Sequence, residues 1–574
     1  MNDSLAVTTE RVDDLPLLLT HLIRMDLPHL LDSYFRQHGN WQGLPAAWVA
    51  TVWLAHLLSQ ADHRLNHVQP WVEQRLHTLQ AFLPHPIHSL DFSDDRLASL
   101  LRMLSDDDAW IGFERALTRT TLRVYDLRPS RVRVDTTTSS GYWNVTEDGL
   151  FQFGHSKDHR PDLPQLKVLL ATLDPLGMPL AMDVLSGERA DDRLYLPAIA
   201  RVRSSLETRG LLYVGDCKMS SLTTRAGVAF HRDFYLCPLS ALQAPPDVIA
   251  GYVAAVTRGE QALVPIERSL PDGSTQLLAE GFELSETLTA VYDETWPVRW
   301  TERRLVVRSP QQAKAAEAAL RKRLAQAEQE LAALPLVRRG KRRWADLAAL
   351  EQAAMAIITR YRVGEVLGVS CWEQVEERAV RSYGPQPARV RTTRRFGVRT
   401  GVKEGALEAA IDQLGWRVYV TNQPGEELSL EQAVLAYREE YIVERSLGRL
   451  KGSPLSLRPM YLAREDHATG LVRLLSLALR ALTLVEFVVR RQLTAEGAKL
   501  AGVYAGQPTR ATARPSAERL LATFRDVTLT IVGLPGRVVW HLTPLTAAQQ
   551  RILELMGYSS TIYTRLTGDS NDPP

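Results

Sequence analysis

Apolar residues change their spacing near residue 130 of the chain. Before this point they recur at intervals of three and four, as over residues 97–104, which predicts amphipathic helices. After it, the string RVRVDTTT alternates polar and apolar residues, so Val132 and Val134 lie on one face of a strand and Asp135 on the other. We therefore expect a helical N-terminal domain over residues 1–126, followed by a sheet.

Further strands follow in the sequence. The runs LKVLLATLD at 166–174 and PLAMDVLSG at 179–187 are separated by the turn PLG, as in a hairpin. A helix is expected from about residue 192 to 208, then the short strand LLYVGD that ends at Asp216, then FYLCPL at 234–239. Strands joined by both turns and helices indicate the α/β class with a mixed sheet.

The pattern breaks over residues 241–401, which we interpret as a large mixed α+β insertion domain. The strings TLTAVYD and RRLVVRS predict strands, and Ser309 then opens a helix as its N-cap. Leucines and an alanine over 320–334 form a heptad-like seam, more often an internal helical hairpin than a dimer zipper. For the basic runs at 338–343 and 389–399 we favour DNA contact over a plain exposed face.

The sheet pattern resumes with GWRVYVTN at residues 415–422. Ser429 and Gln432 form a capping box, and Gly452 with Pro454 ends the helix that begins there, which predicts one long helix. The expected domains are the helical N-terminal domain at 1–126, the sheet domain in two parts at 127–240 and 402–495, the insertion at 241–401 and a C-terminal segment at 496–574.

Composition restricts the class of protein without indicating a function. The 574 residues are 45% hydrophobic and 23% charged, an ordinary globular balance, and the length requires several domains. Net charge is +2, so nucleic-acid binding would rest on local basic faces. The three cysteines form no CxxC pair, which argues against structural zinc and disulfides. The most apolar stretch, residues 471–489, contains charged residues and predicts a buried helix, not a membrane span.

Three acidic residues have the chemistry of metal ligands and positions where such ligands occur. Asp135 and Asp216 lie at or just past predicted strand ends, and Glu444 lies on the long helix. Each has an ordinary alternative: Asp135 starts a turn, Asp216 caps the next helix, and Glu444 is a solvated helix residue. Together, two strand-end carboxylates and one helix carboxylate would hold two Mg²⁺ ions about 3.5–4 Å apart, with Mn²⁺ as a substitute.

The predicted long helix also brings other groups to the side of Glu444. At about 100° per residue, Tyr437, Glu440, Glu444 and Lys451 fall within roughly 60° of one another on a continuous helix. Tyr437 and Lys451 are therefore predicted to hold a DNA phosphate beside the metal ions.

The motifs around these residues resemble the DDE transposases of bacterial insertion sequences, which have a ribonuclease H-like catalytic domain. The similarity is to the branch with the signature Tyr, two residues, Arg, three residues, Glu, six residues, Lys, matched here by YREEYIVERSLGRLK. The strings GHSKDHRPDLPQLKVLLATLDPLGMPL, YVGDCKM and LRPMYL also resemble this branch, over about residues 130–490. The resemblance implies that Asp135, Asp216 and Glu444 are the catalytic and metal-binding residues.

The same resemblance implies a transposase that cuts DNA at the ends of a mobile element and joins them to target DNA by two-metal phosphoryl transfer. Its partners would be double-stranded DNA, as terminal inverted repeats and target, and a second copy of the chain in a synaptic homodimer. Its location would be the bacterial cytoplasm, in association with the nucleoid and without a membrane. The residues assigned to DNA contact are Tyr437, Lys451, Arg445, Arg449, Lys157, Lys167 and Arg458.

Glu440 departs from the family's pattern, since it occupies the position of the expected arginine. Arg438 lies about 160° away on the helix and does not replace that arginine, so either Arg449 or a residue of the insertion serves instead, or DNA binding is altered or impaired. Glu440 keeps two alternatives open. One is a DNA-binding protein derived from a transposase but without catalysis, and the other is a nuclease of the same fold without strand transfer.

Overall fold

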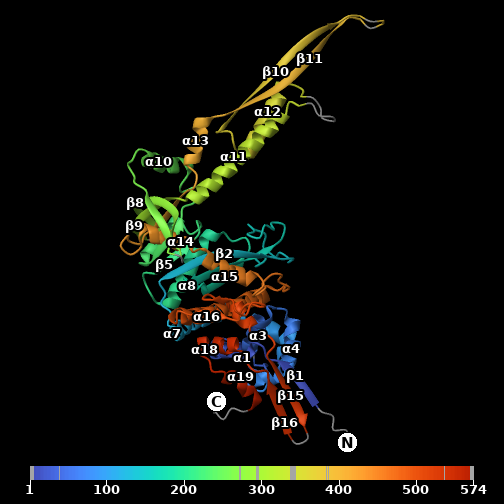
Figure 1. Ribbon diagram of the computed structural model, residues 1–574, viewed down its shortest axis with the longest axis vertical. Coiled ribbons are helices and arrows are strands. Elements are labelled where there is room, and N and C mark those ends of the chain that lie inside the picture. Colours follow the sequence, from blue (N-terminus) through green and yellow to red (C-terminus); the bar gives the residue numbers. More distant parts are fainter. Residues whose placement is uncertain are drawn as a thin grey trace. The chain divides into compact units, whose positions relative to one another are not determined.

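A computed structural model of the chain shows a mixed α/β architecture (Figure 1). Its contacts divide the chain into two units. Unit 1 contains Met1–Cys237, Thr289–Trp300 and Ala436–Pro574, and unit 2 contains Pro238–Leu288 and Thr301–Leu435. The structure describes residues 6–568 with the exception of 38, 271–272, 293–295, 337–343, 383, 386 and 535–536.

Unit 1 contains a mixed sheet with the strand order β4-β3-β2-β5-β6. β2 (Arg131–Ser140), β3 (Gln165–Leu173) and β4 (Met178–Ser186) form an antiparallel meander. β5 (Leu212–Gly215) and β6 (Phe234–Pro238) continue the sheet parallel to β2. The predicted strands and the hairpin are confirmed. β2 is longer than expected and places Asp135 inside the strand, because its pairing with β3 continues to Ser140.

The apolar stretch near residue 480 lies in α16 (Glu465–Ala495), which packs against β4 and against helices of the N-terminal region. Two arginines within the apolar stretch are buried and bonded: Arg473 donates to the carbonyl of Leu104 at 2.9 Å, and Arg480 donates to the hydroxyl of Thr118 at 3.1 Å. The prediction of a buried helix is confirmed. Among the described residues, no helix is both long enough and apolar enough to cross a membrane.

The N-terminal region is helical except for its first strand. β1 (Ala6–Arg11) pairs antiparallel with β15 (Thr528–Leu534), which also pairs with β16 (Arg537–Leu542). This region is therefore not entirely helical, and it shares a sheet with the C-terminal segment, which no local pattern reveals because the partner strands come from opposite ends of the chain. Helices of unit 1 include α1 (Leu15–Arg24), α2 (Leu27–Tyr34), α3 (Ala46–Gln60), α4 (Leu65–Glu73), α5 (Leu76–Gln80), α6 (Asp94–Leu104), α7 (Asp107–Val124), α8 (Tyr195–Leu206), α9 (Leu222–Phe230), α17 (Ala517–Ala522), α18 (Ala547–Met556) and α19 (Thr561–Thr564).

Unit 2 holds the greater part of four strands, in the order β12-β9-β8-β7. β9 (Trp296–Arg308) pairs antiparallel with β12 (Trp416–Thr421), and β7 (Val264–Ser269) pairs antiparallel with β8 (Thr275–Tyr292). The sequence assigned residues from 402 onward to the second part of the sheet domain. By its contacts β12 groups with unit 2, where it pairs antiparallel with β9.

The seam of the insertion belongs to a helical hairpin. α11 (Pro310–Ala333) packs against α12 (Leu347–Tyr361), and the two helices share a buried cluster of leucine, isoleucine and alanine side chains. Ser309 caps α11 as predicted, since its side chain accepts a hydrogen bond from the backbone of Gln312. The internal hairpin is thus confirmed for the seam.

One of the two basic runs of the insertion lies within the described residues. The run at 338–343 lies outside the described residues. The run at 389–399 lies in β11 (Arg389–Val402), which pairs antiparallel with β10 (Leu367–Val380) as a two-stranded ribbon. Two further helices of this unit are α10 (Pro246–Thr257) and α13 (Glu404–Asp412).

Candidate active site

The helix that carries Glu444 is shorter than predicted. The expected single helix is divided into α14 (Leu430–Arg438) and α15 (Tyr441–Lys451). In a continuous helix, the N–H of Glu440 would donate to the carbonyl of Ala436. In the structure that carbonyl accepts from Arg133 Nη2 at 2.6 Å, and the N–H of Glu440 donates to the carbonyl of Tyr437 at 3.0 Å.

This break lies among the residues that the helical wheel groups on one side. Tyr437 lies buried on α14 and hydrogen-bonds the Glu440 carboxyl, which lies on the link between the helices. Glu444 is in the first turn of α15, and Lys451 is its last residue. The prediction of one continuous helix is therefore wrong, but Tyr437, Glu440 and Glu444 still lie together, since Tyr437 bonds Glu440 and the charge of Glu444 raises the pKa of Glu440.

Asp135 and Asp216 come from adjacent parallel strands. Val134 of β2 is paired with Gly215 of β5, so the two aspartates follow directly at neighbouring positions. The hydroxyl of Tyr195 donates to Asp216 Oδ1 at 2.6 Å, as does the N–H of Lys218 at 2.8 Å. Asp216 does not cap the next helix, α9, whose cap is a serine.

The carboxyl group of Asp135 is in a strongly acidic environment. Burial raises its pKa above the ordinary value, and the charge of Asp216 adds to this rise. Lys157 opposes it: its Nζ lies 3.4 Å from Asp135 Oδ1 and also donates to the carbonyl of Thr136 at 2.6 Å. The N–H of Thr136 donates to the same carboxylate oxygen at 2.7 Å. A single lysine thus compensates only part of the negative charge.

Glu440 adds a fourth carboxyl group to this environment. Burial raises its pKa, and the charges of Asp135, Glu444 and Asp216 raise it further. The charges of the three acids identified from sequence, Asp135, Asp216 and Glu444, therefore all act on the carboxyl group of Glu440. Negative charge is concentrated where β2, β5 and the start of α15 meet.

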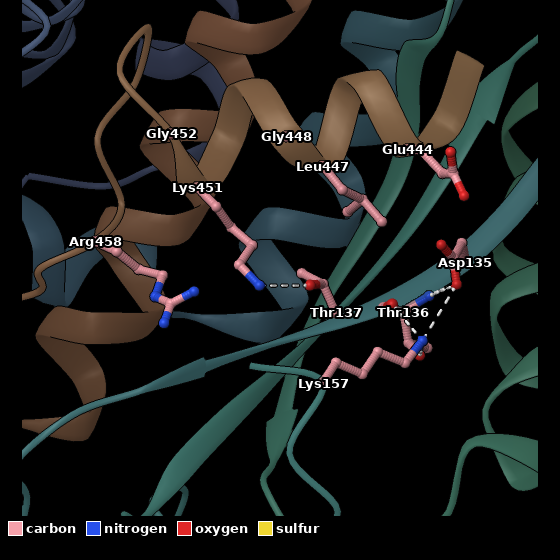
Figure 2. Close-up of a pocket in the computed structure, with 10 residues that line it drawn as sticks. All are labelled: Asp135, Thr136, Thr137, Lys157, Glu444, Leu447, Gly448, Lys451, Gly452 and Arg458. Atoms are coloured by element: carbon pink, nitrogen blue, oxygen red, sulfur yellow. Dashed lines mark hydrogen bonds and ion pairs between the residues drawn. The ribbon is translucent and has the colours of Figure 1, made fainter. Parts of the chain in front are cut away.

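A pocket of about 510 Å³ extends from Asp135 along α15 (Figure 2). Figure 2 shows the carboxyl groups of Asp135 and Glu444 facing one another at one end, with Lys451 and Arg458 at the other. We call these the acidic end and the basic end. Asp216 does not line the pocket but lies beside Asp135. The lining residues are Asp135, Thr136, Thr137, Lys157, Glu444, Leu447, Gly448, Lys451, Gly452 and Arg458.

The two cations of the basic end share one buried acid. Lys451 Nζ donates to Asp158 Oδ1 at 2.5 Å and to the hydroxyl of Thr137 at 3.0 Å. Arg458 Nη1 lies 2.8 Å from the same oxygen of Asp158, whose side chain is 4% exposed. Two positive groups and one negative group leave this end with a net positive charge.

Three of the cations assigned to DNA contact are bound inside unit 1. Lys167 is buried and its Nζ lies 2.6 Å from Asp191 Oδ1. Arg445 forms a bidentate pair with Glu486 at 2.7 and 2.8 Å, and the buried Arg449 pairs with Glu486 and Glu518. The two arginine pairs hold α15 against α16 and α17. Lys167 and Arg449 are buried, whereas the side chain of Arg445 is 41% exposed, and the DNA contacts expected of these three residues stay predictions.

Two polar residues of the site were not identified from sequence. Tyr195 bonds Asp216, and Asp158 holds the basic end. Asp158 lies in the string GHSKDH, where an acid among charged residues looks like a solvated loop residue. Tyr195 opens α8, which precedes β5 in the sequence, so no short spacing links it to Asp216.

The donor chemistry of the acidic end suits a hard divalent cation, since carboxylate oxygens are the ligands that Mg²⁺ prefers. Burial and mutual repulsion raise the pKa values of Asp135 and Glu440, which a bound cation would relieve. Within the described part of the chain, however, no three His, Cys, Asp or Glu side chains are spaced to hold one metal ion. The residues fit the ion by chemistry and charge, not by a preformed cage.

Comparisons with known proteins give weak structural likenesses and no match in sequence. No protein-family profile and no curated protein matches the sequence. Among solved structures, a piggyBac transposase in a synaptic complex with hairpin DNA is similar over 88% of this chain and 76% of its own. The identity is 9% and the TM-score is 0.32, so the proposal below rests on the site itself.

Proposed function

We propose that this chain is a DDE-type transposase that cuts DNA at the ends of a mobile element and joins them to target DNA. The observation that carries the proposal is the pocket along α15, which has Asp135 and Glu444 at one end and Lys451 and Arg458 at the other. Such a pocket suits a phosphodiester backbone, with the reacting phosphate at the acidic end and a neighbouring phosphate at the basic end.

Asp135, Asp216 and Glu444 are the residues that would hold two Mg²⁺ ions, or Mn²⁺ in their place. When bound, these ions would polarise the phosphate and lower the pKa of the attacking hydroxyl or water. The hydrogen bond from the Tyr195 hydroxyl fixes the orientation of Asp216 beside Asp135. Tyr195 is thus a positioning residue in this proposal.

The cations of the pocket would bind and orient the DNA strand. Glu444 and Lys451 are seven residues apart on α15, which corresponds to a rise of about 10 Å along the helix. This exceeds the rise per nucleotide of about 3.4 Å along one strand, so Lys451 and Arg458 would contact a phosphate beyond the reacting one. Lys157, at the acidic end, takes the place of the arginine that the family's pattern puts at Glu440.

The sheet of unit 1 supports the ribonuclease H-like fold expected from the resemblance. It combines an antiparallel meander with parallel strands, and its two aspartates lie on adjacent parallel strands. The partners proposed from the same resemblance are terminal inverted repeats, target DNA and a second copy of the chain, since pairing two ends requires at least two protomers.

Glu440 favours a second candidate, a DNA-binding protein of this fold that does not cleave. Its carboxyl group adds negative charge beside Asp135, Glu444 and Asp216. This charge would oppose the approach of a phosphate unless a divalent cation neutralises it. The two candidates differ in whether DNA is cut.

The test is cleavage of duplex DNA that carries the inverted repeats flanking the gene, with Mg²⁺ or Mn²⁺. Wild type is expected to cut at the repeat ends, and Glu444→Gln to reduce the rate on the order of a thousandfold. Glu431→Gln, an exposed carboxylate on α14, is the matched control and should cut like wild type. Specific binding without cleavage by wild type would favour the second candidate. Cleavage restored by Glu440→Arg would identify Glu440 as the cause.

Metal binding is measured separately, without DNA. Mn²⁺ should raise the thermal unfolding midpoint of wild type, because a ligand that binds only the folded state stabilises it. Asp135→Asn should remove most of this rise. An equal rise in both proteins would contradict the assignment of Asp135 as a metal ligand.

A further inference from the structure

The ribbon of unit 2 extends past the helices that support it. β10 and β11 are each 14 residues long and pair from Leu367↔Val402 to Val380↔Arg389. Near the helices, Leu367, Val398 and Val402 join the core with α11 and α12. Figure 1 shows the ribbon continuing beyond α12. Most side chains of this outer part are exposed on both faces of the ribbon, so no packing within the unit accounts for it.

The two faces of the ribbon differ in charge. Side chains alternate along a strand, and directly paired residues share a face. One face, which we call the arginine face, has five arginines and one glutamate, a net charge of +4. The opposite face has Arg394 against Glu373 and Glu377, a net charge of −1. The charged residues of the arginine face are Arg378, Arg389, Arg391, Arg395, Arg399 and Glu376.

Little within the ribbon neutralises the arginine face. All five of its arginines are exposed. The ion pair between Arg395 and Glu376 is 3.7 Å long and both side chains are about half exposed or more, at 64% and 48%. On the opposite face, Arg394 pairs more closely with Glu373, at 3.3 Å. The arginine face thus presents its charge to solvent.

An aromatic ring also lies flat on the arginine face. Trp372 is paired with Gly397, and a Cβ on that glycine would lie 2.2 Å from the indole ring. Only glycine therefore allows the ring to lie across the ribbon at this point. Trp372 is 45% exposed, so part of the ring faces solvent among the arginines.

We infer that the arginine face of the β10–β11 ribbon binds a groove of double-stranded DNA. This inference rests on the proposed function only in that the chain acts on DNA. The major groove of B-DNA is about 12 Å wide and admits a two-stranded ribbon. Arginines two residues apart on one strand are about 7 Å apart, within reach of successive phosphates and base edges. The guanidinium group is suited to both, because its planar fork binds phosphate and guanine bidentately.

The experiment compares two single arginines on opposite faces. Arg391 and Arg394 are both exposed and lie three positions apart on β11. The variants Arg391→Gln and Arg394→Gln each remove one positive charge. Each change is placed in the full chain carrying Glu444→Gln, which prevents cleavage. The probe is a mixed-sequence DNA duplex of about four helical turns. Affinity is measured as a function of salt concentration, with thermal unfolding as a check that both variants are folded.

Arg391→Gln should lower the affinity severalfold at moderate salt and reduce the slope of log affinity against log salt by about 1. The double variant Arg391→Gln with Arg395→Gln should reduce this slope by about 2, and Arg394→Gln should leave the slope unchanged. Equal effects of Arg391→Gln and Arg394→Gln, or no effect of either, would overturn the inference. The second outcome would instead favour an acidic protein as the occupant of this face.

Failure of the proposed function gives a different result from failure of this inference. If the wild-type chain does not cut repeat-end DNA but the two faces differ in the salt experiment, the ribbon binds DNA and the transposase proposal fails. If wild type cuts and the two faces behave alike, the transposase proposal stands and the ribbon inference is wrong.

Discussion

Arginines of unit 1 and arginines of the β10–β11 ribbon occupy opposite environments. In unit 1, Arg133 is 1% exposed and lies 2.8 Å from Asp174, and Arg449 is held by Glu486 and Glu518. On the ribbon, Arg391 and Arg395 are exposed, and the pair formed by Arg395 is long. Arginine holds elements together in the first region and presents charge to solvent in the second.

A basic residue close in sequence to an acid of the candidate site therefore need not line the pocket. Arg445 and Arg449 follow Glu444 within five residues, yet both bind Glu486 on α16. The cations that line the pocket are Lys451 at the end of α15 and Lys157 and Arg458, which lie outside helices and strands. Removing the partners of buried and exposed arginines should therefore have unequal effects.

The largest effect is expected from Glu486→Gln. This change removes the negative charge that compensates the buried Arg449 and replaces one of the two acceptor oxygens with an amide donor that faces the arginines, so unit 1 should lose about 3–5 kcal/mol of stability. The denaturant midpoint of unit 1 measures the loss. A change below about 1 kcal/mol would mean that the network is solvated like a surface ion pair, and that the arginines of unit 1 do not differ from those of the ribbon in their effect on stability.

A smaller effect should appear as a pH dependence in unit 1. Burial lowers the pKa of His21 to about 4. As the pH falls below about 6.5, His21 binds a proton in the unfolded chain but not in the folded one. The free energy of unfolding therefore decreases between about pH 6.5 and pH 4. The loss amounts to roughly 3 kcal/mol for this residue.

Denaturant midpoints measured at several pH values test this dependence. His21→Gln should weaken it, while His56, another buried histidine whose pKa burial lowers to about 4, remains as a source of acid sensitivity. Identical pH profiles for wild type and His21→Gln would show that His21 is protonated without penalty in the folded protein.

The smallest effect is expected on the ribbon. Glu376→Gln removes the partner of Arg395 from a pair exposed at both ends, so stability should change by less than about 0.5 kcal/mol. The same change should strengthen DNA binding slightly, because it removes the one acid of the arginine face. A loss of stability comparable to that of Glu486→Gln would mean that the ribbon is held by its ion pairs.

Much of the local structure could be predicted from the sequence. Alternation around Asp135, the hairpin between β3 and β4, the N-cap at Ser309 and the buried helix α16 are local patterns of apolar and capping residues, and each is present. The positions of Asp135 and Asp216 near strands follow from the same patterns. β1 was missed, because its strand partner lies at the other end of the chain.

How these elements meet depends on contacts between residues far apart in the chain. A capping box and an apolar stripe indicate a helix through residue 440, but α14 ends at Arg438, where the carbonyl of Ala436 accepts from Arg133 of β2. The sequence supplied the acids, the cations and the elements that carry them. Which cations face the pocket and which are bound to Glu486 depends on partners far away in the chain, since burial and pairing are properties of the packed fold.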